Sequence, residues 1–348
     1  MIQFNPLTIK QWRRFRSIKR GFWSAVLLLC LMMLSCCAEV LINKRAVVVS
    51  FEGQLYFPTY ANFFPGKTFG LDYEYETNYR ELQEIFNQQN DGNWVWLPLV
   101  PYDPYENDLK ELEYPPYAPS LRDKHYLGTD STGRDVVARL VYGFRLAMGF
   151  ALFLLISQYV IGVAVGCAMG YWGGIFDLFF QRIIEIWNNV PFLYVIMIVA
   201  SIVVPGFWTL MLVMVIFGWT GMTWYMRTST YKEKAREYVS AARALGASAP
   251  RVVFSHILPN TISIIVTFVP FSIAGGITSL TALDYLGFGL PPPTPSWGEL
   301  LAQGTSNLET PWIVSSVVIA MVSVLLMVTY VGEAIREAFD PKQFTYYE

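Results

Sequence analysis

The stretch LAMGFALFLLISQYVIGVAVGCAM, residues 146–169, contains no charged residue. A helix that rises 1.5 Å per residue needs about 20 apolar residues to cross roughly 30 Å of hydrocarbon, so this stretch is long enough to span a membrane. Further stretches of the same kind lie at about 22–42, 190–206, 207–226, 261–283 and 312–332. The sequence therefore predicts an all-α polytopic membrane protein with six transmembrane helices.

The composition agrees with a membrane protein. Of the 348 residues, 54% are hydrophobic and 15% are charged. A soluble domain carries about 25% charged residues, so this chain has too few charges to cover a water-facing surface. The same figures exclude a disordered protein and a basic nucleic-acid binder. A soluble fold that buries all six stretches is disfavoured, because none of them has the polar face of an amphipathic helix.

Charge is sorted along the chain in a way that predicts orientation. Residues 1–21 are basic and contain no acid, segment 227–260 is also basic, and segments 43–140 and 284–311 are acidic. Because Lys and Arg are retained on the cytoplasmic side, we expect both termini and the 227–260 segment in the cytoplasm. A cleaved signal peptide is the alternative for the N-terminus, and an uncleaved anchor fits the long apolar stretch better.

These boundaries predict three parts of the chain. Residues 1–42 form a cytoplasmic N-terminus and the first span, and 43–140 form an irregular extracytoplasmic insertion that ends in an interfacial helix. Residues 141–348 form the core domain, with a cytoplasmic loop at 228–260 and an outer loop at 284–311. Inside the insertion we expect strands or loops near 46–57 and 93–101 and a short helix near 78–90.

The cytoplasmic loop combines helix formers with small residues. Residues 232–245 favour a helix, Gly246 favours its end, and Pro250 can begin a second short helix that ends before Pro259. The small side chains near Ala241 would let the groove of another protein approach the backbone closely. The alternative is an amphipathic stretch packed on its own bundle.

Four motifs carry a family resemblance. The run Ser240-Ala241-Ala242, three residues, Gly246, nine residues and then HILP at 256–259 resembles the EAA loop of ABC importer permeases, with Ser240 in place of Glu and His256 in place of Ile. The runs at 127–135, 286–298 and 333–341 agree with the oligopeptide and dipeptide branch. The long insertion resembles that of a permease for microcin C and oligopeptides within that branch.

The resemblance implies a type I ABC importer permease that moves oligopeptides or peptide-like compounds into the cytoplasm across the bacterial inner membrane. The expected partners are a second homologous permease, two cytoplasmic ATPase domains and an extracytoplasmic peptide-binding protein. ATP and Mg would be used by the ATPases, and this chain would bind no cofactor or metal and have no catalytic residue. Glu237 is a candidate replacement for the missing Glu. The ATPase-coupling residues would be Glu237, Ser240, Ala241, Ala242, Leu245, Gly246, Ile257, Leu258 and Pro259.

Other candidate residues lie in the spans and the outer loop. Gly162, Gly166 and Gly170 form a small-residue ridge that favours close helix packing. The polar face of the fifth span is a candidate translocation path, and the outer loop is a candidate contact for the binding protein. The path residues are Thr278, Ser279, Thr281 and Asp284; the contact residues are Pro292, Pro293 and Trp297.

Competing functions are an ion-coupled secondary transporter, a non-transporting membrane anchor and an intramembrane enzyme. A coupled carrier usually has ionisable residues in mid-span, whereas here they lie at the span ends. His125 and His256 are the two histidines of the chain, so a histidine-based catalytic triad or zinc site has little material. The sequence alone does not specify the substrate.

Overall fold

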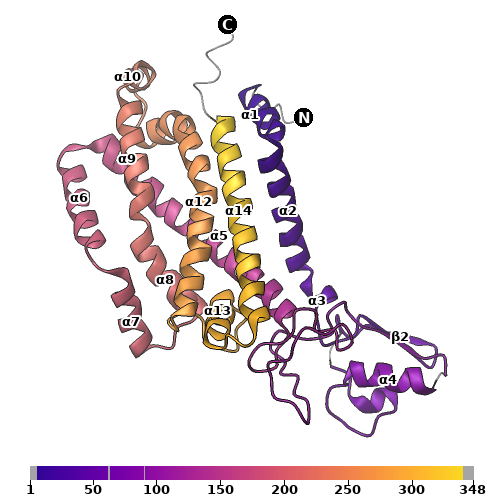
Figure 1. Cartoon of the computed structure of the whole chain (residues 1–348). Helices are drawn as coiled ribbons and strands as arrows, with labels where there is room; N and C mark the ends of the chain where they lie inside the picture. Colours follow the sequence, from indigo (N-terminus) through magenta and orange to yellow (C-terminus); the bar gives the residue numbers. More distant parts are fainter. Residues whose placement is uncertain (1–5, 62, 90, 340–348) are drawn as a thin grey trace.

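The computed structural model describes residues 6–61, 63–89 and 91–339. Long helices lie side by side in a bundle, and a small mixed unit formed by the insertion sits at one end of it (Figure 1). Among the described residues, five helices are long and apolar enough to cross a membrane, and the number rises to 6 if one bent pair is a single span. The expected all-α polytopic architecture is confirmed.

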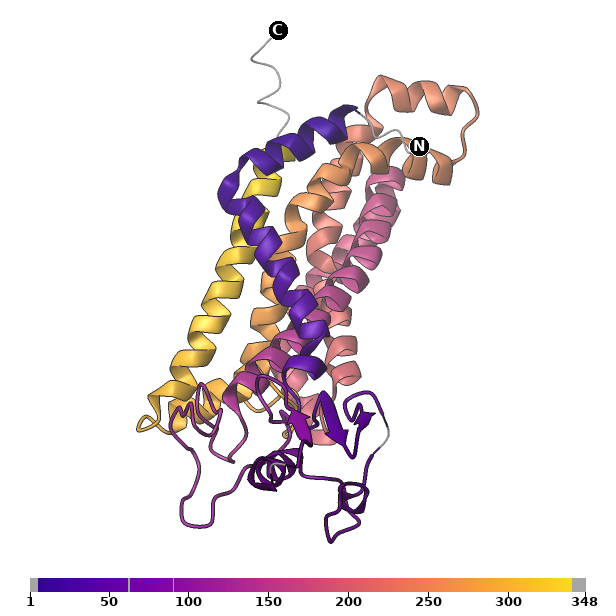
Figure 2. The same ribbon diagram turned by 90° about the vertical axis from the view of Figure 1, so that its right-hand side faces the viewer.

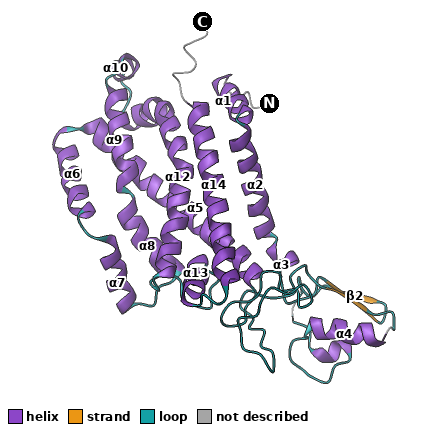
Figure 3. Cartoon of the chain, in the orientation of Figure 1, coloured by secondary structure: helices purple, strands orange, loops and turns teal. Residues whose placement is uncertain are grey.

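The N-terminal half contains two helices, a short helical turn and the insertion. The bundle side consists of α1 (Pro6–Ser17), α2 (Lys19–Cys36) and α3 (Ala38–Leu41). The insertion contains β1 (Val48–Phe51), β2 (Gln54–Tyr56), η1 (Gly66–Phe69), α4 (Tyr79–Gln89) and β3 (Trp94–Trp96). These strands and α4 lie where the sequence predicts them (Figure 3).

The remaining helices build most of the bundle. They are α5 (Val136–Trp172), α6 (Gly174–Asn188), α7 (Phe192–Ile202), α8 (Phe207–Gly218), α9 (Thr220–Lys234), α10 (Glu237–Ala244), α11 (Ala249–Val252), the π-helical turn η2 (Val253–Ile257), α12 (Leu258–Tyr285), α13 (Trp297–Ser306) and α14 (Pro311–Phe339). The tail motif at 333–341 ends on Asp340 and Pro341, which lie outside the described residues.

The third span differs from the expected single stretch at 190–206. It consists of α6 and α7, which are bent by 68° at the break between them. Pro191 lacks an amide hydrogen and disfavours helix at the residue before it, so the helix is interrupted there. Segment 174–188 carries Asp177, Arg182 and Glu185, and because of these charges its sequence does not have the pattern of an apolar span.

The expected interfacial helix is instead the beginning of α5. Asp135 caps this helix, since its carboxylate accepts a hydrogen bond of 2.8 Å from the Ala138 amide. From Val136 the helix continues without a break to Trp172. One element therefore leads from the insertion through the bundle.

The glycine ridge of α5 packs against the backbone of α9. A Cβ built on Gly166 would lie 2.5 Å from the Thr223 carbonyl oxygen, and one on Gly170 would lie 2.6 Å from the Arg227 carbonyl oxygen. Such approaches are possible only without a side chain, as in small-residue packing between membrane helices. The expected packing role of the ridge is confirmed.

The insertion has its own aromatic core. Its three antiparallel strands are ordered β2-β1-β3. Phe51, Phe69, Tyr79 and Phe86 pack together between the sheet and α4, and the Phe51 and Phe86 rings stack at 5.8 Å. Trp94 and Trp96 lie exposed on β3. The aromatic residues of the insertion therefore serve partly as core and partly as surface.

The two ends of the bundle carry different elements. The basic helix α1, the end of α14 and the α10 segment lie at one end, while the insertion and α13 lie at the other (Figures 1 and 2). We call these the inner and the outer end.

Candidate coupling elbow and membrane cavity

The segment at residues 235–257, which we call the elbow, projects from the inner end. A continuous helix over 232–245 is not formed, because α9 ends at Lys234 and α10 begins at Glu237 in a new direction. No helix-breaking residue lies at this point. The buried side chain of Val239, which packs with Tyr171, Val252 and Ile257, accounts for the change of direction.

The second half of the elbow also differs from the expected short helix. Helix α11 continues through the π-helical turn η2 directly into α12, with Pro259 in the first turn of α12. Proline lacks an amide hydrogen, and the π-helical turn directly before it is where the regular α-helical hydrogen-bond pattern changes. The elbow is thus joined to the fifth span without a flexible connection.

Gly246 closes α10 through a Schellman motif. Its φ is +84°, its amide donates to the Arg243 carbonyl at 3.0 Å, and the Ala247 amide donates to the Ala242 carbonyl at 3.0 Å. A Cβ at Gly246 would meet nothing within 4 Å. The conformation rather than the space favours glycine, and the position is open to solvent.

The predicted coupling residues differ in how far their side chains are exposed. Glu237, Ser240, Ala241, Leu245, Gly246 and Pro259 are exposed, and Ala242 and Leu258 are half-buried. Ile257 is completely buried and packs inside the elbow, so it holds the segment in place and offers no surface to a partner.

A tyrosine that the sequence analysis did not select connects the elbow to the bundle. The Tyr238 hydroxyl donates to Glu233 Oε2 at 2.6 Å and accepts from Asn260 Nδ2 at 3.2 Å. These contacts join α10 to α9 and α12. Burial and the Glu233 carboxylate raise the pKa of Tyr238, so the hydroxyl stays protonated near neutral pH.

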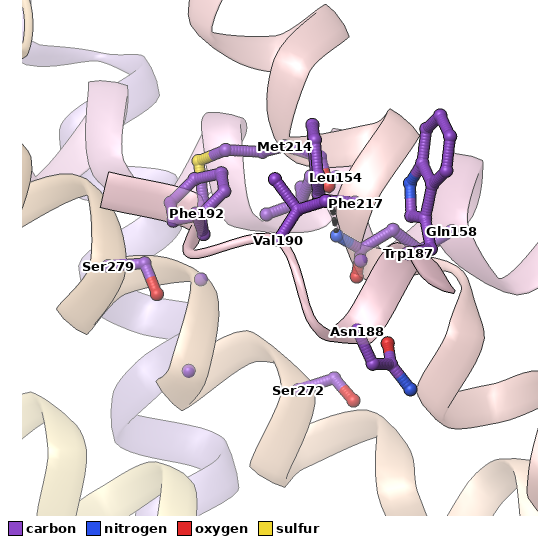
Figure 4. Close-up of a pocket in the computed structure, with 13 residues that line it drawn as sticks. Leu154, Gln158, Trp187, Asn188, Val190, Phe192, Met214, Phe217, Ser272 and Ser279 are labelled. Atoms are coloured by element: carbon purple, nitrogen blue, oxygen red, sulfur yellow. Dashed lines mark hydrogen bonds between the residues drawn. The ribbon is translucent and has the colours of Figure 1, made fainter. Parts of the chain in front are cut away.

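A cavity of about 410 Å³ lies inside the bundle beside the break in the third span (Figure 4). Gln158 of α5, Asn188 of α6 and Ser272 of α12 give it polar groups, and no lining residue is charged. Irregular backbone at membrane depth is tolerated where it is buried in protein or faces a wet cavity. The break at residues 189–191 is therefore explained by the cavity that it borders. The full lining is Leu154, Gln158, Trp187, Asn188, Val190, Phe192, Met214, Phe217, Gly218, Ser272, Gly275, Gly276 and Ser279.

Of the predicted path residues, Ser279 lines this cavity. Thr278 is exposed on another face of α12, and the buried Thr281 hydroxyl donates to the Ile277 carbonyl. Asp284 is buried, and its carboxylate accepts hydrogen bonds from the Leu290 amide and the Ser296 hydroxyl. Asp284 therefore holds the outer loop. The sequence did not single out Gln158, Asn188 and Ser272 as polar groups of one cavity, because they lie on other parts of the chain.

The outer loop contains the helix α13, and Trp297 is not at its tip. Trp297 is 3% exposed, and its indole Nε1 donates to the Leu140 carbonyl at 3.0 Å. It begins α13 directly after the capping residue Ser296, which orients it toward α5. Pro292 and Pro293 are exposed, as expected of residues that contact a partner.

Three buried charged residues, Asp130, Arg134 and Arg139, and the partly buried Glu299 join the outer loop to α5, and we call these four residues the outer charge cluster. Arg134 Nε lies 2.7 Å from Asp130 Oδ2, and Arg134 Nη2 lies 2.7 Å from Glu299 Oε1. Arg139 pairs with Glu299 and Asp130, and it also donates to the carbonyls of Pro104 and Pro293. Arg139, with a side chain that is 0% exposed, therefore ties together the insertion, α5 and the outer loop.

His125 supports this junction. Its ring stacks on Tyr102, Nδ1 lies 2.8 Å from Asp135 Oδ2 and Nε2 lies 3.2 Å from Asp108 Oδ2. Burial alone would lower the pKa of His125, but the two carboxylates raise it above its ordinary value. The motif at 127–135 contains Asp130, Arg134 and Asp135 of this junction. Glu299, the partner of Arg139, is 160 residues away along the chain, so the sequence pattern does not show that the two residues meet.

In the part of the chain that the structure describes, no group of three or more His, Cys, Asp and Glu side chains could hold a metal ion.

Comparison with known proteins gives consistent matches. The profile of the family described as binding-protein-dependent transport system inner membrane component matches residues 162–345. The peptidoglycan transport system permease protein YejE of Agrobacterium fabrum is 37% identical over 98% of this chain and 94% of its own length. The inner membrane ABC transporter permease protein YejE of Escherichia coli K12 is 37% identical over 99% of both chains.

More distant matches cover the core of the chain. The dipeptide transport system permease protein DppC of Haemophilus influenzae is 29% identical over 70% of this chain and 83% of its own length. Among solved structures, an inward-facing MetNI methionine ABC transporter aligns with a TM-score of 0.45 and 16% identity, over 58% of this chain and 96% of that chain.

Proposed function

The chain belongs to the family of binding-protein-dependent transport system inner membrane components, and from this premise we propose that the elbow is the contact through which a cytoplasmic ATPase drives transport. The protein is a permease subunit of an ABC importer for peptides or oligopeptides, and it is a multi-pass protein of the inner membrane. The coupling role of the elbow is our proposal, and one observation supports it.

That observation is the set of small exposed residues on α10 and at Gly246, directly after its end. Ser240, Ala241 and Gly246 lie exposed on the most protruding segment of the inner end, and Val239 and Ile257 hold the same segment firmly from below. A partner can approach this backbone closely. A push on α10 would reach α12 through the buried contact of Val239 with Val252 and Ile257, which lie on the helical segment that continues into α12. Both properties are required of an element that converts closure of an ATPase into movement of a bundle.

The proposal extends to orientation and nucleotide use. The basic helix α1 and the basic elbow lie at the same end, which supports a cytoplasmic location of both termini. ATP and Mg would be bound and hydrolysed by the partner ATPases, and the permease would contribute no catalytic group. Glu237, exposed on the first turn of α10, is the proposed substitute for the family carboxylate absent at Ser240.

We place the translocation path at the cavity beside the broken third span. Its lining offers side-chain amides and hydroxyls and no ionisable group, which suits peptide bonds and disfavours an ion-coupled carrier. A second, homologous permease would complete the path across a heterodimer interface. The exposed Pro292 and Pro293 at the outer end are proposed to meet the peptide-binding protein.

The cargo is proposed from the relatives. The name of the Agrobacterium protein refers to peptidoglycan transport, and the DppC relative is named for dipeptides. We infer that this chain takes up short peptides, including peptides released from peptidoglycan and modified peptides such as microcin C. Competition between labelled tripeptides and these compounds for uptake by cells that express the complete importer tests the range.

Gly246→Asp tests the coupling role. Aspartate tolerates a left-handed backbone, so the elbow should fold, but a charged side chain would then stand in the proposed ATPase contact. We expect peptide uptake and peptide-stimulated ATP hydrolysis by the reconstituted complex to be abolished, with normal membrane insertion.

Gly53→Asp is the matched control. Gly53 also has a positive φ, of +79°, and open space around its Cα, but it lies in the insertion at the outer end. It should leave the coupling of ATP hydrolysis to the permease unchanged. Normal uptake and stimulated hydrolysis in Gly246→Asp would refute the assignment of the elbow.

A further inference from the structure

One face of the insertion sheet carries three large apolar side chains that are exposed. Trp94 and Trp96 of β3 are 46% and 63% exposed, and Leu55 of β2 is 58% exposed. Trp94 and Leu55 pair with Ser50 of β1 from its two sides, and Trp96 lies two residues from Trp94. Alternate residues of a strand point to the same face of a sheet, so the three side chains share one face. We call Leu55, Trp94 and Trp96 the tryptophan face.

The opposite face of the sheet is covered by the core of the insertion. Val49 and Val95, which alternate with the residues of the tryptophan face, are buried in one cluster with Phe86 of α4. Strands β1, β2 and β3 contain no charged residue. An antiparallel sheet with one face in water usually has polar side chains on that face. Two tryptophans and a leucine do not fit this pattern, so the tryptophan face is suited to a partner other than bulk water.

The backbone holds β3 near the boundary of the membrane. The 18 residues of α2 rise about 27 Å, close to the roughly 30 Å of hydrocarbon, so α3 lies at the outer boundary of the apolar layer. The Val100 amide donates to the Leu41 carbonyl of α3 at 3.0 Å, and the Asn43 amide donates to the Val100 carbonyl at 3.1 Å. Trp96 precedes Val100 by four residues, which is at most about 14 Å of chain. The tryptophan face therefore begins close to this boundary.

An apolar surface connects the end of β3 to the spans. Leu99, which is 65% exposed, lines an apolar cavity of about 390 Å³ together with Leu31 and Leu34 of α2 and Ala320 of α14. Leu31 and Leu34 belong to the apolar span α2. The insertion thus reaches the lipid-facing part of the bundle directly after β3.

The arrangement of the elements turns the tryptophan face toward the membrane. The strands lie beside α2 and α3 at the edge of the bundle, and α4 lies farther from the inner end than the strands do (Figures 1 and 2). Because α4 covers the side of the sheet that is turned away from the bundle, the tryptophan face is on the side of the lipid around α2. Tryptophan is enriched at the boundary between lipid and water, where its ring is apolar and its N–H group can donate a hydrogen bond.

We propose that the tryptophan face rests on the lipid leaflet at the outer end of the bundle, with the indole rings of Trp94 and Trp96 among the lipid headgroups. Their N–H groups donate to oxygen atoms of the lipids, and Leu55 contacts the upper part of the acyl chains. Because the strands carry no charge, this contact requires no anionic lipid. The insertion is thereby held against the membrane by the sheet as well as by the outer charge cluster.

Fluorine NMR of the complete permease complex in lipid nanodiscs, labelled with 5-fluorotryptophan and without the binding protein, tests this proposal. The chain contains 11 tryptophans, so Trp94→Phe and Trp96→Phe are used to assign the two resonances. A nitroxide on the upper acyl chain should broaden both resonances several-fold more than a gadolinium chelate in the water does. The result should be the same in phosphatidylcholine discs with and without phosphatidylglycerol.

Two reference positions calibrate the measurement. Trp23, which is 64% exposed on α2, should be broadened by the lipid nitroxide. Tyr75 is 67% exposed in the segment that follows η1, and a label introduced by Tyr75→Trp should be broadened by the gadolinium chelate.

Leu55→Asp tests the contact itself. A carboxylate on the tryptophan face would have to leave water to stay at the lipid, so the face should lift and the chelate should broaden the Trp96 resonance several-fold more. Gln54→Asp is the matched control, because Gln54 is the exposed neighbour of Leu55 on β2 and points to the other face. It should leave both resonances unchanged.

Three outcomes overturn the proposal. Stronger broadening by the chelate than by the lipid nitroxide would place the tryptophan face in water. Protection of both resonances from both agents would show that another subunit covers it. Equal responses to Leu55→Asp and Gln54→Asp would show that the face makes no specific contact with lipid. None of these outcomes bears on the elbow, which Gly246→Asp tests separately.

Discussion

The inner and outer ends of the bundle are stabilised by different physical interactions. The elbow at the inner end presents small exposed residues, and its attachment consists of a compact apolar contact around Val239 and the hydrogen bonds of Tyr238. The outer end is fastened by the buried pairs of Arg134, Arg139 and Glu299.

The elbow is therefore suited to contact with a partner, whereas the outer charge cluster forms a rigid junction. Removing one member of the outer charge cluster leaves an unbalanced charge that solvent screens poorly, so the outer end depends on every member of the cluster. The elbow can lose single contacts at a small cost. The two ends should therefore respond very differently to mutation.

The largest effect is expected for Glu299→Ala at the outer end. It would leave the two buried guanidinium groups of Arg134 and Arg139 with Asp130 as the remaining carboxylate of the cluster, and this unbalanced buried charge costs up to about 3–5 kcal/mol of folding stability. Thermal unfolding of the purified permease measures this loss. Glu309→Ala removes an exposed carboxylate from the same loop and should change little; equal effects of the two variants would contradict the cluster.

Gly166→Ala tests the packing that connects the two ends. Its new methyl group would lie 2.5 Å from the Thr223 carbonyl oxygen and push α9 from α5, at a cost of about 1–3 kcal/mol. Gly149→Ala on the same helix meets nothing within 4 Å and is the control. Unfolding curves in detergent compare them, and a neutral Gly166→Ala would show that the helices are free to separate.

His125 should make the outer junction sensitive to pH. Because its folded-state pKa is raised, its contribution is complete below the unfolded value of about 6.5 and is lost as the pH rises through the folded value. The loss amounts to about 1.4 kcal/mol for each unit by which the pKa is raised. Stability measured from pH 5.5 to 8.5 should fall in the unaltered chain and stay flat in His125→Gln; parallel curves would exclude His125 as the cause.

The smallest effect is expected for Tyr238→Phe at the inner end. The change removes the hydrogen bonds to Glu233 and Asn260, at a cost of about 1 kcal/mol. Peptide-stimulated ATP hydrolysis should fall several-fold while the midpoint of global unfolding barely moves. Tyr231→Phe, at an exposed position of α9, provides the comparison, and a large drop in global stability would show that the elbow is part of the main fold.

The sequence predicted best where one local pattern decides the outcome. Uncharged stretches predicted the bundle, and the small-residue spacing of Gly162, Gly166 and Gly170 predicted the packing of α5. In the insertion, the residue pattern located the segments that form strands but left open whether they were strands or loops. The glycine at 246 predicted the end of α10 because few other residues adopt its conformation.

It failed where distant segments meet. The direction of Trp297 depends on α5, and the role of Asp284 depends on the Leu290 amide and the Ser296 hydroxyl, which reach it by way of a turn. The polar cavity is lined by Gln158, Asn188 and Ser272 from three different helices, so no single stretch of sequence predicts it. The broken third span was missed because its charged half resembles a loop in composition.

The unbroken course of α5 has a mechanical consequence. Its 37 residues form a rod of about 55 Å, well beyond the roughly 30 Å of hydrocarbon. Near one end it carries Arg139 of the outer charge cluster, and near the other Tyr171, which touches the core of the elbow. When the outer end is the fixed point, a tilt of about 1° displaces the inner end by about 1 Å, so an ångström-scale movement at the elbow requires only a small rotation of this one helix.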